Sequence, residues 1–205
     1  MNRRARLASA AMLAVLAVVL AACASSAASG QRSGTYQGVG LEPPQPRPSF
    51  TLSDTDGKAF HFGRRTAGHP TLLFFGYTEC PDICPTTMAN INQALATLPA
   101  SVQQDFYVVF ASTDVKHDTG KIIKDWLANF TGGVSATFVG LRGTQAQVDA
   151  AQTAAHIPLA EDGGRTHSTQ VLFFGADDYA RVTWLQSDRQ VAQMSHDLAV
   201  ATKSS

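Results

Sequence analysis

The fold of this 205-residue chain is decided by one stretch, Thr71-Leu72-Leu73-Phe74-Phe75-Gly76-Tyr77-Thr78-Glu79-Cys80-Pro81-Asp82-Ile83-Cys84-Pro85. It opens with a continuous apolar run, which is typical of a strand buried on both faces. Pro85 suits the first turn of a following helix, where a missing N–H costs nothing. Cys80 and Cys84 therefore lie in a strand-to-helix turn. Two thiols placed there can close a disulfide or bind a soft metal ion as thiolates.

Strand and helix patterns alternate on both sides of this stretch. Before it, Phe50–Leu52 and Ala59–Phe62 flank the turn Ser53–Gly57 and predict an N-terminal hairpin. After it, we expect a helix from Pro85 to Leu98, a strand Phe106–Ala111, a helix Ile122–Phe130, a strand Thr137–Leu141, a helix Thr144–Ala155, strands Val171–Phe174 and Ala180–Leu185, and a helix Asp188–Ala201. The right-handed crossover rule makes the central strands parallel. The order predicts an α/β, thioredoxin-like domain with a central mixed sheet flanked by helices, and it places the cysteines where chemistry usually occurs in such sheets.

The spacing of the cysteines favours a functional role over a structural one. Three residues separate Cys80 from Cys84, whereas thioredoxin-type oxidoreductases have two. Pro81 and Pro85 each follow a cysteine and stiffen the loop. A disulfide that closes so small a loop would stabilise the fold little. The alternative is a structural disulfide that pins the loop.

His167 is the candidate third ligand. It lies between the glycine-bearing loop Glu161–Thr166 and a predicted core strand. A lone histidine is more often a surface or core residue than a ligand, and the sequence alone does not bring this one beside the cysteines. Two thiolates and one imidazole would form a soft, low-coordination set that suits monovalent copper best. A structural zinc site would need a fourth protein ligand, which His117 or Asp118 would have to supply.

The first 22 residues predict a signal peptide. Arginines at positions 3, 4 and 6 precede the uncharged apolar stretch Leu7–Ala22, which is short for a membrane-spanning helix. Leu20-Ala21-Ala22-Cys23 resembles the lipobox of bacterial lipoproteins, and this resemblance implies a lipid on Cys23. The alternative is an ordinary signal peptide that leaves Cys23 free. Residues 23–48 lack apolar periodicity and are predicted to be a lipid anchor and disordered tether before a folded domain at 49–205.

Composition narrows the function classes. The chain has 16 Lys and Arg against 16 Asp and Glu, so no basic patch suggests nucleic acid. Its 44% apolar content supports one globular domain. There are 3 cysteines, and a lipid on Cys23 would leave one pair in an exported, disulfide-permissive compartment.

Four motifs together resemble the Sco/SenC family of copper-binding, thioredoxin-like proteins that help assemble cytochrome c oxidase. They are Phe50–Gly57, Phe74–Pro85, Ser112–Thr119 and His167-Ser168, and the resemblance extends over about Phe50 to Ala201. It implies that Cys80, Cys84 and His167 ligate copper and that the loop from Asp114 to Asp118 lies near the site. The family usually has Asp-Pro-Glu-Arg-Asp in that loop, where this chain has Asp114-Val115-Lys116-His117-Asp118.

The resemblance leaves two main functions open. The first is a copper metallochaperone, which is not an enzyme, that uses Cys80, Cys84 and His167 to carry a copper ion to the binuclear copper site of an oxidase subunit. A lipid on Cys23 would anchor it to the outer face of the cytoplasmic membrane. The second is a thiol:disulfide oxidoreductase in which Cys80 and Cys84 form a redox pair that keeps the oxidase copper-ligand cysteines reduced, without need of His167. A thioredoxin-fold peroxidase and a passive copper buffer are weaker alternatives, the latter because the chain has 4 methionines and no methionine- or histidine-rich tract.

Overall fold

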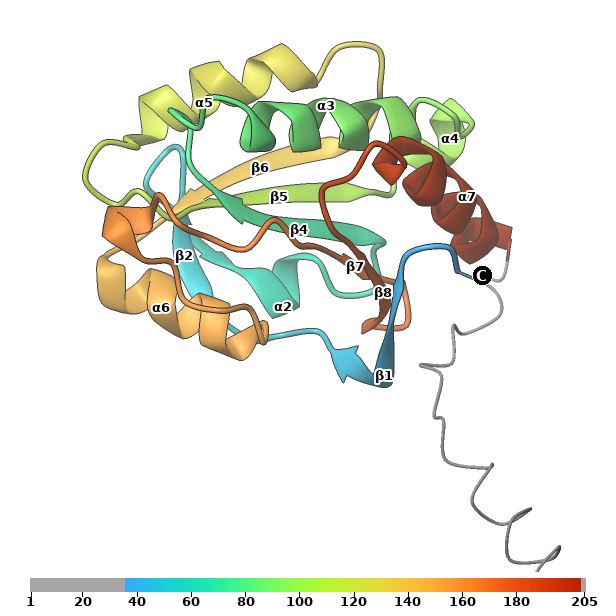
Figure 1. Cartoon of the computed structure of the whole chain (residues 1–205), viewed down its shortest axis with the longest axis horizontal. Coiled ribbons are helices and arrows are strands. Elements are labelled where there is room, and N and C mark those ends of the chain that lie inside the picture. Colours follow the sequence, from blue (N-terminus) through green and yellow to red (C-terminus); the bar gives the residue numbers. More distant parts are fainter. Residues whose placement is uncertain (1–35, 204–205) are drawn as a thin grey trace, which may run out of the picture. The chain divides into compact units, whose positions relative to one another are not determined.

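One mixed sheet of eight strands organises residues 36–203, the part of the chain that the computed structural model describes (Figure 1). The strands are β1 (Val39–Pro46), β2 (Thr51–Asp54), β3 (Ala59–His61), β4 (Thr71–Gly76), β5 (Tyr107–Ser112), β6 (Thr137–Arg142), β7 (Val171–Phe174) and β8 (Tyr179–Trp184). Their order across the sheet is β1-β8-β7-β4-β5-β6-β2-β3. β4, β5 and β6 are parallel, and every other pair is antiparallel. The predicted α/β class, the parallel centre and the N-terminal hairpin β2–β3 are confirmed.

The central strands are apolar throughout because each face of the sheet has its own core. Successive side chains of a strand point to opposite faces. In β4, Leu72 and Phe74 belong to one buried cluster, while Leu73 and Phe75 belong to the other. β5 and β7 divide their side chains in the same way. All six residues of β4 are buried, which explains why its sequence shows no polar alternation.

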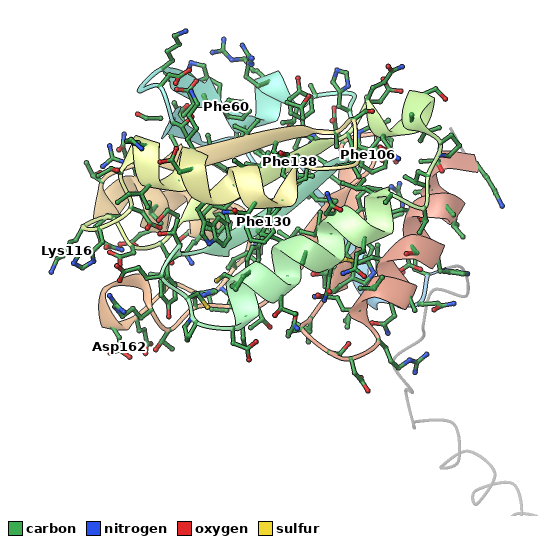
Figure 2. The ribbon with its side chains drawn as sticks, turned by 90° about the horizontal axis from the view of Figure 1, so that it is seen from above. Phe60, Phe106, Lys116, Phe130, Phe138 and Asp162 are labelled. Carbon is green, nitrogen blue, oxygen red and sulfur yellow. The ribbon has the colours of Figure 1, made fainter. Side chains whose placement is uncertain are left out.

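Helices cover both faces of the sheet (Figure 1). The first core packs against α3 (Ile83–Leu95), α5 (Gly120–Leu127) and α7 (Gln190–Lys203), and the second packs against α2 (Phe62–Arg65) and α6 (Gln145–Ala154). α3 and α7 lie side by side, as Figure 2 shows from above. The remaining helices of the described residues are short, at Ala100–Gln103, Ala128–Phe130 and Asp162–Gly164. Within these residues, no helix combines the length and apolarity that a membrane crossing requires.

The prediction of a disordered tether up to residue 48 is wrong for its last part. Residues 39–46 form the edge strand β1, which pairs with β8. Proline lacks the N–H that an interior strand must donate, so a proline-rich strand fits only at an edge. The buried Asp197 carboxylate accepts hydrogen bonds from the backbone N–H of Gln37 (2.7 Å) and Gly38 (2.9 Å) and fixes the start of this segment. The predicted signal peptide and the lipid on Cys23 lie outside the described residues.

Buried Arg47 fixes the other end of the segment. Its guanidinium donates to the Asp178 carboxylate (2.7 Å) and to the Thr66 hydroxyl (2.9 Å), and it lies over the ring of Phe174. These long-range contacts anchor the chain between β1 and β2. They are polar contacts, so no apolar pattern in the sequence predicts them.

Candidate metal centre

Cys80, Cys84 and His167 meet at the carboxyl end of β4. Cys80 lies in the turn after β4, and Cys84 is the second residue of α3. His167 precedes β7, which runs antiparallel to β4 and pairs Val171 with Phe74. The start of β7 therefore lies beside the end of β4, and this pairing brings the histidine to the cysteines. Their three potential ligand atoms all lie within 4.8 Å of one another.

Hydrogen bonds orient all three side chains. The Nδ1 of His167 is 2.9 Å from the carbonyl oxygen of Ser168, which can only accept a hydrogen bond, so the N–H lies on Nδ1. This tautomer leaves the lone pair of Nε2 directed at the Cys84 sulfur, 3.4 Å away. The backbone N–H of Cys84 donates to the Cys80 sulfur at 3.3 Å, and both cysteines are free thiols. The three potential metal-ligand atoms are thus oriented before any metal binds.

The two thiols have opposite environments. Burial acts to raise the pKa of the Cys80 thiol, but backbone N–H groups of Cys84, Asp82 and Ile83 at the start of α3 outweigh it and lower that pKa overall. Cys84 is fully buried, and this burial raises the pKa of its thiol strongly. Cys80 is therefore the more acidic, more accessible sulfur, and Cys84 retains its proton until a cation compensates its charge.

Aromatic rings enclose the imidazole. The Tyr77 ring meets the His167 ring edge-on at 5.6 Å between centroids, and Phe74 lies at 6.1 Å on another side. This burial lowers the pKa of His167, against the opposing effect of its hydrogen bond to Ser168. A histidine kept neutral at physiological pH retains the lone pair that a metal needs.

The loop between β5 and α5 is hydrogen-bonded to the cysteine loop. The buried Asp118 carboxylate accepts hydrogen bonds from the Thr78 backbone N–H (3.1 Å), the Thr78 hydroxyl and the Ser112 hydroxyl. The expected proximity of the Asp114–Asp118 loop to the site is therefore confirmed. Asp118 is engaged in these bonds, and the His117 ring is held by Asp114. Neither joins the Cys80, Cys84 and His167 group, which is the single three-residue metal-binding cluster among residues 36–203.

Two glycines that the sequence analysis did not single out make the site possible. A Cβ on Gly76 would lie 2.8 Å from the Cys84 sulfur. Gly164, with φ +97°, lets the histidine loop approach the β5–α5 loop so closely that a Cβ would lie 2.1 Å from the Thr113 carbonyl oxygen. The Thr113 hydroxyl lies 2.7 Å from the carbonyl oxygen of Gly164 and 3.1 Å from that of Gly76, so its single O–H can donate to either and links these loops. A glycine directly after a buried apolar run was the available signal for Gly76.

A cavity of about 340 Å³ opens onto this group. Tyr77, Cys80, Arg165 and His167 contribute to its lining, and the buried Cys84 lies beneath it. Two sulfurs and one imidazole suit a soft monovalent ion such as Cu(I). A closed structural zinc site needs four protein ligands, and the site provides three with an open side. The arrangement can bind a soft metal and also admit a further ligand to it.

Comparison with known proteins agrees with the geometry. The family model described as SCO1/SenC matches residues 40–203. The chain belongs to the SCO1/SenC family. It is 36% identical over 115 residues to Protein SenC of Rhodobacter capsulatus, which covers 56% of this chain and 49% of that protein. The chain spans about half to two thirds of the length of the curated relatives it matches.

Solved structures show the same fold. Bradyrhizobium japonicum ScoI with copper bound has a TM-score of 0.61 and 27% identity, covering 76% of this chain and 99% of that one. BsSco, described with a disulfide switch as a member of the Sco family of cytochrome c oxidase assembly proteins, has a TM-score of 0.62 at 20% identity, covering 78% and 94%. The thioredoxin-like, copper-binding family identified from the motifs is thereby confirmed.

Proposed function

We propose that this chain is a copper metallochaperone that delivers copper to the binuclear copper site of cytochrome c oxidase during assembly of that enzyme. The observation that carries the proposal is the convergence of Cys80, Cys84 and His167, with ligand atoms within 4.8 Å, beneath an open cavity. The copper-bound state of Bradyrhizobium japonicum ScoI and the oxidase-assembly role of the Sco family support it.

Copper transfer would use the open side of the three-ligand site. A recipient cysteine would approach through the cavity and bind copper before the chain's own sulfurs release it. Cys80 lines this cavity and Cys84 does not, so the Cys80–copper bond is the first that a recipient can replace. Ligand exchange at Cu(I) changes no oxidation state, and it therefore needs no redox partner.

The proposed location follows from the N-terminal sequence. Leu20-Ala21-Ala22-Cys23 after an apolar segment supports a lipid on Cys23 and attachment to the outer face of the cytoplasmic membrane. Twelve intervening residues would separate this anchor from Tyr36, the first described residue. The copper-site subunit of the oxidase would then be met at the same membrane surface.

A thiol:disulfide oxidoreductase is the second candidate, and the unequal thiols favour it. Cys80 has the lowered pKa and the exposure that an attacking thiolate needs. The backbone nitrogen of Cys84 is 3.3 Å from the Cys80 sulfur, so Cys84 is near enough to resolve a mixed disulfide formed on Cys80. This reaction would keep the copper-ligand cysteines of the oxidase reduced, and it would make no use of His167.

Metal analysis of the full chain separates these functions. A Cys23→Ser background removes the third thiol, and the chain is reduced and loaded with Cu(I) without oxygen. We expect one tightly held copper per chain, lost in Cys80→Ala and Cys84→Ala and weakened in His167→Ala. His69→Ala is the matched control, since His69 is exposed and contacts Tyr107 away from the cysteines. A chain that retains no copper but reduces a disulfide substrate, with His167→Ala equally active, would favour the oxidoreductase.

A further inference from the structure

Arg165 is a cation at the mouth of the metal site that the ligand set does not use. It lies two residues before His167 and lines the same cavity as Cys80. Its guanidinium is 5.7 Å above the Tyr77 ring and 3.2 Å from the carboxylate of Glu79, the residue before Cys80. The carboxylate of buried Asp114 lies farther from the guanidinium, at 3.9 Å, and already accepts a hydrogen bond from the Nδ1 of His117. Arg165 therefore bridges the two loops that carry the ligands.

The contact between Arg165 and Glu79 is easily exchanged. The side chain of Arg165 is 48% exposed and that of Glu79 is 62% exposed, and a single N–O contact joins them. Exposed pairs of this kind contribute little to stability. The cation–π contact of Arg165 with the Tyr77 ring holds the guanidinium at the cavity when Glu79 moves away. An anion that enters the cavity can thus replace Glu79 without displacing Arg165.

Copper transfer creates a need for such a cation. Cu(I) with two thiolates and a neutral imidazole carries one net negative charge, and a third thiolate from the recipient raises this to two. Glu79 adds a further negative charge beside the cavity, and Asp82 lines it. Without a cation, an incoming anionic ligand would meet only repulsion there.

We propose that Arg165 docks the incoming anionic copper ligand, which in copper delivery is a cysteine thiolate of the recipient, by exchanging Glu79 for it. This inference rests on the proposed metallochaperone function. The sulfur–copper bond of the recipient forms and the Cys80 sulfur–copper bond breaks, while copper remains monovalent. The recipient cysteine loses its proton to solvent before it docks as a thiolate, and Cys80 leaves copper as a thiolate, so this exchange itself moves no proton. Arg165 thereby acts as a positioning residue that selects negatively charged partners.

A purely structural role makes a different prediction. If Arg165 only ties the two loops through Glu79, then removal of either partner has the same effect. If Arg165 docks anions, Glu79 competes with them, so Arg165→Gln slows transfer and Glu79→Gln accelerates it. The opposite signs distinguish the two roles.

Stopped-flow transfer from the copper-loaded full chain, in the Cys23→Ser background, measures this. Two chelators with the same dimethylphenanthroline donor serve as acceptors, the dianionic bathocuproine disulfonate and the neutral neocuproine. We expect Arg165→Gln to slow transfer to the dianion roughly fivefold, to leave the neutral acceptor within about twofold, and to lose this selectivity at high salt. Glu79→Gln should speed transfer to the dianion, and Arg165→Lys should retain most of the preference because it retains the charge.

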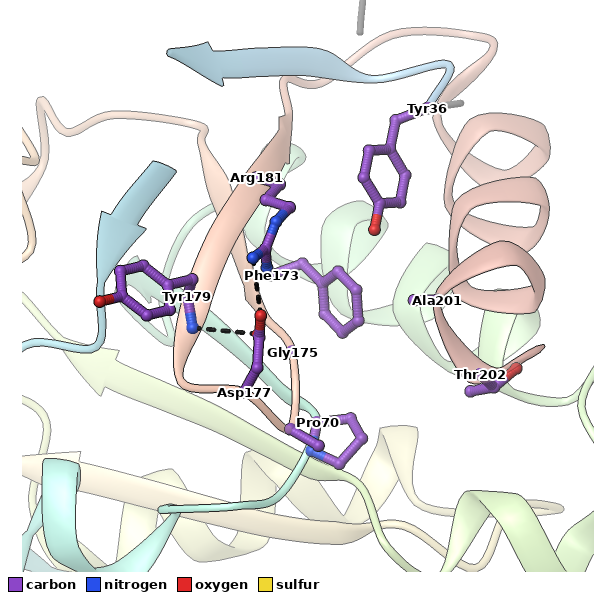
Figure 3. A pocket seen from close by; sticks show the side chains of 10 residues that line it. Tyr36, Pro70, Phe173, Gly175, Asp177, Tyr179, Arg181, Ala201 and Thr202 are labelled. Atoms are coloured by element: carbon purple, nitrogen blue, oxygen red, sulfur yellow. Dashed lines mark hydrogen bonds and ion pairs between the residues drawn. The ribbon is translucent and has the colours of Figure 1, made fainter. Parts of the chain in front are cut away.

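Arg181→Gln is the matched control. Arg181 is 42% exposed and also paired with one carboxylate, Asp177, at 2.7 Å. It lines a separate cavity at the other end of β7 (Figure 3), so its replacement should change neither rate. Equal slowing by Arg165→Gln and Glu79→Gln, or equal effects on both chelators, would overturn the docking role while copper binding stands. A parent chain that retains no copper would overturn the proposed function together with this inference.

Discussion

Asp118 provides a quantitative test of how the site is supported, because one buried carboxylate holds the cysteine loop. It accepts three hydrogen bonds, from the Thr78 backbone N–H (3.1 Å), the Thr78 hydroxyl and the Ser112 hydroxyl. Asp118→Ala leaves all three donors without this acceptor. Hydroxyl groups can rotate toward other acceptors, but the backbone N–H of half-buried Thr78 cannot. We therefore expect a loss of about 3–5 kcal/mol in the free energy of unfolding, because each hydrogen bond to a charged acceptor contributes about 1.5–3 kcal/mol.

Asp118→Asn should cost less, about 1–2 kcal/mol, because the amide keeps one acceptor oxygen and its NH₂ can donate to a rotated hydroxyl. Urea unfolding of the reduced, metal-free chain at neutral pH measures both values, with an unchanged slope against urea concentration showing that the unfolded states are alike.

Asp125→Ala is the matched control, since Asp125 is 62% exposed on α5 and pairs with Lys121. It should change the unfolding free energy by about 0.5 kcal/mol or less. A loss for Asp118→Ala as small as that of the control would refute the supporting role of Asp118, because the three hydrogen bonds would then contribute nothing that solvent does not replace.

Three further changes test other parts of the structure. Gly76→Ala, whose Cβ would lie 2.8 Å from the Cys84 sulfur, should destabilise the chain by about 1–3 kcal/mol in urea and weaken Cu(I) binding; full affinity at wild-type stability would contradict this tight contact. Iodoacetamide should modify Cys80 well before Cys84, with a midpoint below the ordinary thiol pKa because the folded Cys80 pKa is lowered, and peptide mass mapping would reveal the reverse order if it occurred. Asp197→Ala leaves the Trp184 indole N–H (2.9 Å) and the two backbone N–H groups just before β1 without their acceptor. It should raise amide hydrogen exchange in residues 37–40 while β4 stays protected, and an equal rise in both would count against a local role.

The sequence revealed those parts of the fold whose signal is local. The apolar runs at Thr71–Phe75 and Val171–Phe174 identify strands because both faces of the sheet are covered, which leaves no polar position in them. Pro85 marks the first turn of α3 for an equally local reason, its missing N–H. The short helix α2 was not predicted and begins at Phe62, where the predicted strand was expected to end. The end of α3 at Leu95 instead of Leu98 reflects how helices terminate rather than a different topology.

The parts that local sequence patterns left open or missed depend on distant contacts. His167 reaches Cys84 across 83 residues because β7 pairs antiparallel with β4, and nothing near the histidine encodes that pairing. β1 is ordered by Asp197 and Arg47, polar residues whose partners lie more than 100 positions away. Its position between a glycine-bearing loop and a predicted strand made His167 a candidate, and the motif resemblance implied that it joins the two cysteines.

The inequality of the two thiols bears on how the two proposed functions relate. Copper binding requires Cys84 to lose its proton in a fully buried place, and the metal ion provides the compensating charge. Once copper leaves, Cys84 regains its proton, and Cys80 remains as the single acidic, accessible sulfur. The metal-free site is then in the form that attacks a disulfide. Copper delivery and thiol reduction would therefore be successive states of one site, with the order set by whether copper is bound, and a variant that equalised the two thiols would impair both.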